Sequence, residues 1–151
     1  MVMTTENIER LKNEVAKRLS DLLSDGVLTV IFTTSSKEVL IENAVYEDEL
    51  KNDDVCRRNL ILRFFGRYAE GVRLSCYRRV ILLTLPLLPT SIMRRLEFRG
   101  LKTVDLVVMK TVQAIGRLLP SNDIDVVLLD KRFKRFCGVL ANYGIQCVGN
   151  G

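Results

Sequence analysis

The sequence predicts an α/β protein, with one domain over residues 1–151 and a mixed β-sheet of about four to five strands flanked by helices. Three observations indicate this class. The chain starts with an amphipathic helical pattern, short apolar runs recur along it, and its last third has the pattern strand, helix, strand. A chain of this length buries roughly two thirds of the surface that its unfolded form exposes, so it can build one core without a metal or disulfides.

The first element expected is an amphipathic helix. Apolar residues recur at helical spacing over residues 8–22, and Thr4 or Thr5 can cap the first turn. Gly26 supplies the left-handed conformation that commonly ends a helix. We therefore expect a helix that ends shortly before Gly26.

A strand follows this helix, and the chain beyond the strand has two possible structures. Residues 27–34 are apolar and β-branched, which predicts the strand. Residues 38–46 can pair with it as an antiparallel hairpin across a short Ser35-Ser36 turn, and we favour this hairpin. Ser35 and Glu38 also form a capping box, which would start a helix instead.

The middle of the chain predicts two helices around a core strand. A broad apolar face at helical spacing indicates a helix over residues 53–71, which ends at Gly71. Residues 80–85 form a core strand that stops before Pro86, because proline has no N–H for a central ladder. Residues 91–98 follow as a short helix.

The last third predicts a long helix and then a strand-helix-strand unit. The helix covers residues 104–119, and the continuous apolar run at 124–129 is typical of a strand covered on both faces. Residues 131–143 are helical and 145–148 form a final strand. Such a unit favours parallel strands joined by a right-handed crossover.

Several classes of protein are excluded by what the sequence lacks. It contains no histidine, which removes Ser-His-Asp and Cys-His catalysis and every imidazole general base. The longest apolar run, residues 80–88, is far shorter than the roughly 20 residues that cross a membrane, and the start lacks an export signal. We expect a cytoplasmic protein without a membrane partner, a metal or another cofactor.

The four cysteines form no C-x-x-C pair, so a zinc site is not expected. Cysteine is often buried as a small apolar residue, and we favour this role for Cys56, Cys76, Cys137 and Cys147. The alternative is a disulfide or redox role for Cys137 and Cys147.

Charge is distributed unevenly along the chain. Residues 1–54 hold 6 basic and 12 acidic residues, residues 55–100 hold 10 and 2, and residues 101–151 hold 7 and 4. All ten basic residues of the middle segment are arginine: Arg57, Arg58, Arg63, Arg67, Arg73, Arg78, Arg79, Arg94, Arg95 and Arg99. Guanidinium groups bond two phosphate oxygens at once and stack on bases, so this composition indicates a nucleic-acid contact.

Two hypotheses explain the arginines. They form a phosphate-binding surface, or they pair with the acidic first third of the chain, as in the ion-pair networks of heat-stable proteins. For the first hypothesis, the expected contacts with nucleic acid, DNA or RNA, are Arg57, Arg58, Arg78, Arg79, Arg94 and Arg95.

A second basic segment, residues 131–136, interleaves lysine and arginine with Phe133 and Phe136, as single-strand binders do. Helical geometry, however, puts both phenylalanines on one face with the apolar residues that follow, so we expect them in the core. The basic residues are then a solvated stripe, and Asp130 caps the helix.

Without histidine, the enzymatic chemistry that fits the remaining residues best is magnesium-dependent phosphodiester cleavage by clustered carboxylates. The candidate ligands are Glu47, Asp48, Glu49, Asp53, Asp54, Asp123, Asp125 and Asp130. Glu49-x-Lys51 loosely matches the E-x-K element of restriction-type nucleases, but it lies in a run of charges typical of a solvated turn.

We therefore expect a non-catalytic, nucleic-acid-associated protein that binds phosphates through arginine. A magnesium-dependent nuclease and a protein-protein interaction module are the alternatives. Leu106 and Met109 lie opposite the inner stripe of the helix at 104–119, near Gln113, and form an apolar spot. From this spot we expect a homodimer.

Overall fold

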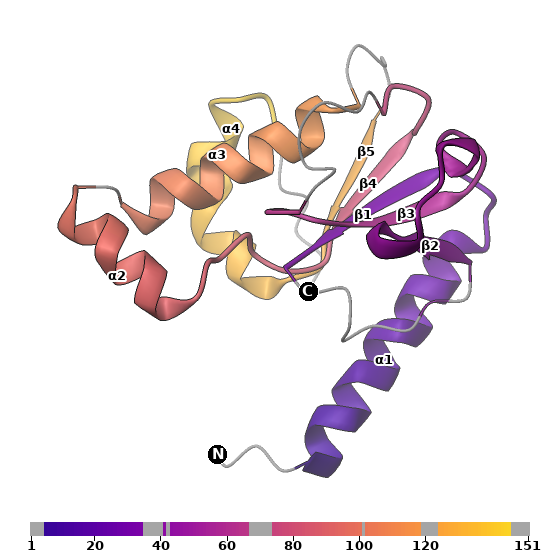
Figure 1. The fold of residues 1–151 in the computed structure, drawn as a ribbon, viewed down its shortest axis with the longest axis horizontal. Coiled ribbons are helices and arrows are strands. Elements are labelled where there is room, and N and C mark those ends of the chain that lie inside the picture. Colours follow the sequence, from indigo (N-terminus) through magenta and orange to yellow (C-terminus); the bar gives the residue numbers. More distant parts are fainter. Residues whose placement is uncertain are drawn as a thin grey trace.

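The structure is a computed structural model, and it describes residues 5–34, 41, 43–66, 74–100, 102–118 and 124–145 (Figure 1). Within them the strands are β1 (Thr29–Thr33), β2 (Ala44–Tyr46), β3 (Asn59–Arg63), β4 (Arg79–Leu82) and β5 (Asp125–Leu128). The helices are α1 (Thr5–Leu23), α2 (Thr90–Phe98), α3 (Thr103–Gly116) and α4 (Cys137–Ala141). Short 3-10 turns are η2 (Glu47–Glu49), η3 (Asn52–Asp54) and η4 (Lys131–Phe136).

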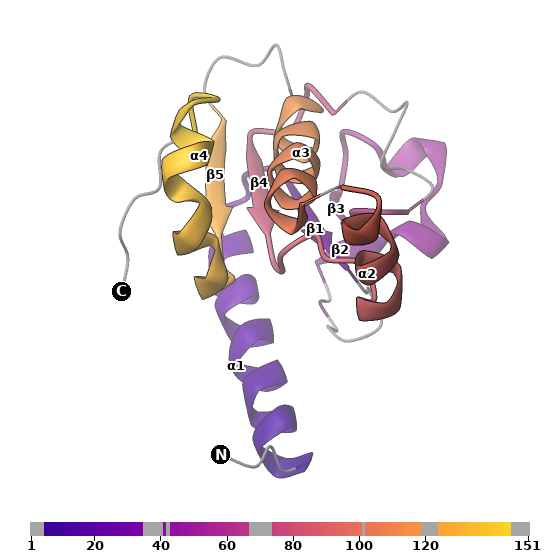
Figure 2. The ribbon, with the colours of Figure 1, turned by 90° about the vertical axis from the view of Figure 1, so that its left-hand side faces the viewer.

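The described strands form one sheet in the order β2-β3-β1-β4-β5, and every pairing is parallel. Helices cover both faces: α3 and α4 lie on one side of the sheet, and α1 lies on the other (Figures 1 and 2). The fold class is therefore α/β with five strands, as the sequence predicts, but the described sheet is parallel throughout and not mixed. All starts of the strands lie along one edge of a parallel sheet, which we call the amino edge.

Side chains of the central strands alternate between two cores. Val30 and Phe32 face the core that contains α3 and α4, whereas Ile31 faces the core that contains Leu19 and Leu23 of α1. The same alternation holds in β3 and β4. A strand that is buried on both faces has a continuous apolar sequence, which explains the short runs without alternating polar residues.

Several predicted elements are confirmed. The first helix ends at Leu23, and Gly26 adopts a φ of 77°, which is the left-handed conformation expected there. The core strand before Pro86, the short helix α2, the long helix α3 and the helical segment after Asp130 are also present. A possible cap at Thr4 lies outside the described residues.

The predicted antiparallel hairpin is wrong. β1 and β2 are not neighbours, because β3 lies between them and pairs with both in parallel. β1 is a central strand and is hydrogen-bonded on both sides by strands that come later in the chain. The alternative, a helix capped at Ser35, falls on residues 35–40, outside the described part.

The predicted helix at 53–71 is also wrong over its described part, where residues 59–63 form strand β3. Leu60, Ile61 and Leu62 are buried at 0 to 1% exposure between the two helical layers. A short apolar run fits one face of a helix and a doubly covered strand equally well, and here burial on both faces favours the strand.

β5 differs from expectation in its place. It is parallel to β4, whereas the parallel partner expected for it is the strand at 145–148; it lies at the edge of the sheet, and its first residue is exposed. The final predicted strand, apart from Ile145, lies outside the described residues.

The prediction of four buried, unbonded cysteines is wrong. Cys56 is exposed and forms a disulfide with Cys76, with Cα atoms 5.7 Å apart. Cys137 is also disulfide-bonded, and Cys147 lies outside the described part. Cys56 and Cys76 meet because the loops before β3 and β4 reach the same edge of the sheet. Among the described helices, none has the length and apolar content to cross a membrane.

Candidate nucleic-acid interface

The structure divides the six arginines of the predicted site into three groups. Arg57 and Arg58 directly precede β3, and Arg78 directly precedes β4, so these three lie at the amino edge. Arg94 and Arg95 lie on α2, which follows the carboxyl end of β4. Arg79, the first residue of β4, is buried at 7% exposure.

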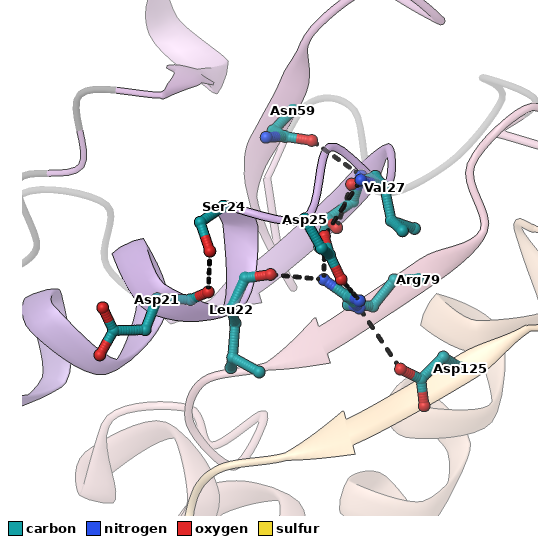
Figure 3. A network of polar contacts seen from close by, with 9 residues as sticks. Asp21, Leu22, Ser24, Asp25, Val27, Asn59, Arg79 and Asp125 are labelled. Carbon is teal, nitrogen blue, oxygen red and sulfur yellow. Dashed lines mark hydrogen bonds and ion pairs between the residues drawn. The ribbon is translucent and has the colours of Figure 1, made fainter.

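Arg79 connects α1 to the sheet (Figure 3). Its guanidinium pairs with Asp25 after α1 and with Asp125 of β5, and its Nη1 donates to the carbonyl oxygen of Leu22 at 2.8 Å. The hydrogen bond with Asp25 raises the pKa of Arg79 and lowers the pKa of the Asp25 carboxyl. The Arg79 guanidinium is therefore already bonded within the protein and is not part of the interface.

Pairing with the acidic first third accounts for only part of the arginines. Arg63 pairs with Glu47 and Asp48 at 2.8 and 2.7 Å, and Arg79 pairs with Asp25. Arg67 and Arg73 lie outside the described residues. The remaining six arginines of the middle segment are exposed and make no ion pair with any described residue: Arg57, Arg58, Arg78, Arg94, Arg95 and Arg99.

Three of them form what we call the amino-edge surface: Arg57, Arg58 and Arg78. The register pairs Val30 with Leu60 and Val80, so Arg58, Leu28 and Arg78 occupy equivalent positions before three adjacent strands. Neighbouring strands lie about 4.8 Å apart, which separates the Arg58 and Arg78 backbones by roughly 10 Å. The Arg78 N–H donates to the Leu28 carbonyl oxygen at 3.0 Å and fixes this spacing.

Tyr77 holds the loop that carries Arg57 and Arg58. Its buried hydroxyl accepts a hydrogen bond from the Cys56 N–H at 3.0 Å and donates to the Arg58 carbonyl oxygen at 2.6 Å. Burial raises the pKa of Tyr77, so the hydroxyl stays protonated and continues to donate. The disulfide to Cys76 anchors the same loop. Arg57 and Arg58 therefore extend from a backbone that is fixed at several points.

Two shallow hollows adjoin this loop, and their charges differ. One, of about 280 Å³, is lined by two arginines and no carboxylate: Gly26, Leu28, Asn43, Arg57, Arg58 and Asn59. The other, of about 320 Å³, combines two cations with two carboxylates: Ala44, Val45, Glu49, Lys51, Asp54 and Arg58. An anion is attracted to the first hollow, whereas the opposite charges of the second largely cancel.

α2 carries the second group of exposed arginines. Arg94, Arg95 and Arg99 lie on it or at its end, and only Met93 of this helix is buried. Phe98 is 94% exposed. Figure 1 shows α2 at the left-hand end of the molecule, beyond α3. We call Arg94, Arg95, Phe98 and Arg99 the α2 surface.

The carboxylates of the alternative nuclease site are dispersed or occupied. Glu47 is buried against Arg63, Asp54 accepts from the Lys51 N–H at 3.0 Å, and Asp125 pairs with Arg79. Asp48 pairs with Arg63, Glu49 and Asp53 are exposed, and Asp123 lies outside the described residues. Within the described part of the chain, no three acidic or cysteine residues are grouped to hold a metal ion.

Asp130 is the helix cap that the sequence predicts. Its carboxylate accepts from the Arg132 N–H at 3.0 Å and from the Leu85 N–H at 3.2 Å, and it pairs with the Arg132 side chain. Burial would raise the pKa of Asp130, but these hydrogen bonds and the Arg132 charge outweigh burial and lower it. Phe133 is buried, as predicted, and Lys131, Lys134 and Arg135 are exposed.

The apolar spot from which the dimer is predicted contains only one of its two expected residues. Leu106 is 5% exposed and lies in the protein, whereas Met109 is 46% exposed. Val104, which the sequence places on the inner stripe, is 43% exposed. The middle of the predicted stripe, Val107, Thr111 and Ile115, is buried as expected.

Sequence reasoning missed Phe98 and Arg99 of the α2 surface, and it missed Tyr77, the buried support of the amino-edge loop. Tyr77 has no polar signal that marks it as a support for the arginine loop, since its two partners are backbone atoms. Phe98 looks like part of an ordinary amphipathic helix, and its exposure depends on where α2 sits. Arg99 could have been included from the sequence, because it is one of the ten arginines of the middle segment.

The described part of the chain is thus an α/β protein with a parallel sheet, and it exposes arginines on the amino-edge surface and on the α2 surface. A comparison of the sequence with models of known protein families finds no match, and a search of curated proteins finds none either.

Proposed function

We propose that this protein is a non-catalytic nucleic-acid-binding protein that contacts phosphates through exposed arginines of the amino-edge and α2 surfaces. The observation that carries the proposal is the set of six exposed arginines without an ion-pair partner among the described residues. Arginine without a protein carboxylate retains its fork of donors for phosphate oxygens.

The amino-edge surface supports phosphate binding by its rigidity as well as its charge. Cys76 and Tyr77 fix the loop of Arg57 and Arg58, so little backbone freedom has to be lost on binding. The adjoining hollow is lined by Asn43 and Asn59 and by no carboxylate. The Asn59 amide already donates to the Asn43 carbonyl oxygen at 3.1 Å, so the arginines supply the attraction for phosphate in this hollow.

The test is the salt dependence of binding to a labelled duplex and to a single strand of the same sequence. Each phosphate contact contributes about 0.7 to 0.9 to the slope of log affinity against log salt. We expect Arg57→Ala, Arg58→Ala and Arg78→Ala together to weaken binding and to reduce the slope by up to about 2 to 3. Fluorescence anisotropy over a salt series gives both quantities.

The matched control removes three other exposed basic residues, Lys131→Ala, Lys134→Ala and Arg135→Ala, so both variants lose the same charge. The control is expected to leave the slope nearly unchanged. Equal losses in the two variants would show that only net charge matters and would overturn the amino-edge site. A wild-type protein without measurable binding would overturn the function, and magnesium-dependent cleavage would favour the nuclease.

The cytoplasmic location and the homodimer stay predictions. Disulfides are rare in most cytosolic proteins but frequent inside hyperthermophilic cells, so we propose the cytoplasm of a heat-adapted organism. For the dimer, the exposed apolar residues of α3 are Val104 and Met109 in place of Leu106. The small apolar area of these two residues is the observation that supports the dimer.

A further inference from the structure

Phe98 is the most exposed of the large apolar side chains described. It is 94% exposed, while the next, Tyr143, reaches 59%. Folding therefore gains almost nothing from this ring, since the hydrophobic contribution follows the area removed from water. A single exposed apolar residue is ordinary on its own, so its surroundings have to decide whether it binds something.

The surroundings of Phe98 are cationic. At 100° per residue, Phe98 lies between Arg94 and Arg95, which are four and three residues before it and are its nearest neighbours on the helix surface. Met93, the buried residue of α2, lies about 140° away. The ring and both guanidinium groups thus share the face that is turned away from the protein, and Arg99 adds a third charge at the end of the helix.

The single carboxylate of α2 does not neutralise this face. Glu97 accepts a hydrogen bond from the Thr103 hydroxyl at 2.8 Å, which directs it towards the start of α3. It lies only about 40° from Met93 on the helix, near the side that faces the protein. The α2 surface therefore combines an exposed aromatic ring with positive charge.

We propose that the α2 surface binds a single-stranded segment of nucleic acid, with one base stacked on Phe98 and adjacent phosphates on Arg94, Arg95 and Arg99. This inference rests on the proposed function and adds the substrate class of the α2 surface. Single-strand binders combine these elements: cations along the backbone and an aromatic side chain on which an unpaired base stacks. In a duplex the bases are already stacked, so the ring has no base face to contact.

Geometry favours this ligand over a lipid surface. A helix that lies on a membrane keeps its apolar residues together and its basic residues on the opposite face. On α2 the exposed apolar residues, Ile92 and Phe98, lie about 120° apart with Arg95 between them. The core of a protein interface is depleted in charge, whereas Phe98 is flanked by arginine.

The α2 surface also lies apart from the amino-edge surface. Arg78 precedes β4, and α2 follows the carboxyl end of β4. The two surfaces are therefore separated by at least the length of this strand, about 13 Å. Variants of one surface therefore leave the geometry of the other intact, which allows the two to be tested independently.

The first experiment uses Phe98→Trp, because the chain contains no tryptophan and the variant has a single indole at the site. A single strand of about 10 nucleotides is expected to quench its fluorescence by stacking. The matched duplex and vesicles of anionic lipid are expected to leave the emission nearly unchanged. A response to vesicles or to the duplex but not to the single strand would overturn the proposal.

The second experiment compares affinities of full-length variants for the same single strand. Loss of one stacked base corresponds to about a 5- to 150-fold weaker binding, which we expect for Phe98→Ala. Phe98→Leu keeps an apolar side chain and loses the flat ring, so it is expected to resemble Phe98→Ala, and Phe98→Trp to retain affinity. Arg94→Ala with Arg95→Ala is expected to weaken binding and flatten its salt dependence.

Tyr143→Ala, which removes an exposed aromatic outside the α2 surface, is the control and is expected to bind like the wild type. Unchanged single-strand affinity in Phe98→Ala, or full affinity in Phe98→Leu, would overturn the α2 proposal. If wild type binds nucleic acid and only the amino-edge variants weaken it, the proposed function stands without the α2 site. If wild type binds neither strand form, both fail.

Discussion

At the scale of single residues, Arg79 and Arg78 show how neighbours of one type acquire different roles. Arg79 points into the angle between α1 and the sheet and is bonded to Asp25, Asp125 and the Leu22 carbonyl oxygen (Figure 3). Arg78 is exposed and bonded through its backbone. Alternate residues of a strand face opposite sides, so adjacent arginines meet different surroundings.

This difference predicts that the two arginines contribute unequally to stability. Arg79→Met keeps most of the volume but leaves the Leu22 carbonyl and both aspartates without their donor, so we expect a loss of about 1 to 3 kcal/mol in the free energy of unfolding. Asp25 and Asp125 remain partly hydrated, which limits the cost. Arg78→Met is the control, with an expected change below about 0.5 kcal/mol. Urea unfolding measures both, and equal values would contradict the role of Arg79.

At the scale of elements, the sequence predicts helices and isolated strands better than strand pairing. The first helix and α3 follow from apolar spacing because each buries one stripe against a neighbour. β3 could not be told from a helix, since Leu60, Ile61 and Leu62 are apolar in either structure. Pairing of β1 with β3 and β4 depends on contacts between distant segments, which local patterns do not contain.

The same limit applies to the candidate site. Composition alone identifies arginine as the residue of interest, and the charge counts by segment place it in the middle of the chain. Which arginines are occupied depends on where the carboxylates come to lie: Arg63 meets Glu47, and Arg79 meets Asp25. Those encounters are set by the strand order and have no signature in the sequence.

The disulfide between Cys56 and Cys76 joins the loops before β3 and β4, so its effect belongs to these elements. The cysteines are 20 residues apart, and closing a loop of this length is worth about 3 kcal/mol in the chain-entropy model. We therefore expect Cys56→Ala with Cys76→Ala to lower the free energy of unfolding by about that amount.

The comparison is made with wild type by urea unfolding without reductant, so that the disulfide of Cys137 stays intact in both proteins. The Tyr77 hydroxyl still bonds the Cys56 N–H and the Arg58 carbonyl oxygen in the variant. Nucleic-acid binding should consequently change less than stability does. Equal stability of the two proteins would show that the disulfide adds nothing to the anchored loop.

At the scale of the whole molecule, ion pairs join the acidic start of the chain to its basic middle. Asp25, which follows α1, pairs with Arg79 of β4. Glu47 and Asp48, which follow β2, pair with Arg63 of β3. These pairs neutralise part of the acidic segment inside the fold. Six exposed arginines of the middle segment remain among the described residues, and they lie at the amino edge and on α2.

The same ion pairs predict how stability responds to acid. The carboxyls of Asp25 and Asp130 have a lowered pKa in the folded protein, Asp25 through Arg79 and Asp130 through hydrogen bonds and the Arg132 charge that outweigh burial. A carboxylate with a lowered pKa stabilises the fold above its unfolded pKa, about 3.9, and this stabilisation is lost as pH falls through the folded pKa. We expect the free energy of unfolding to fall below about pH 4.

Asp25→Asn with Asp130→Asn should reduce this dependence, because the two variant side chains do not take up protons. The slope of unfolding free energy against pH reports the difference in bound protons between the unfolded and folded states, so the variant slope below about pH 4 is expected to be shallower. Asp21→Asn, an exposed aspartate of α1, is the control. Urea unfolding across the acid range measures the slopes. Identical slopes in wild type and the double variant would contradict the role of these two carboxylates, whatever the stability at neutral pH.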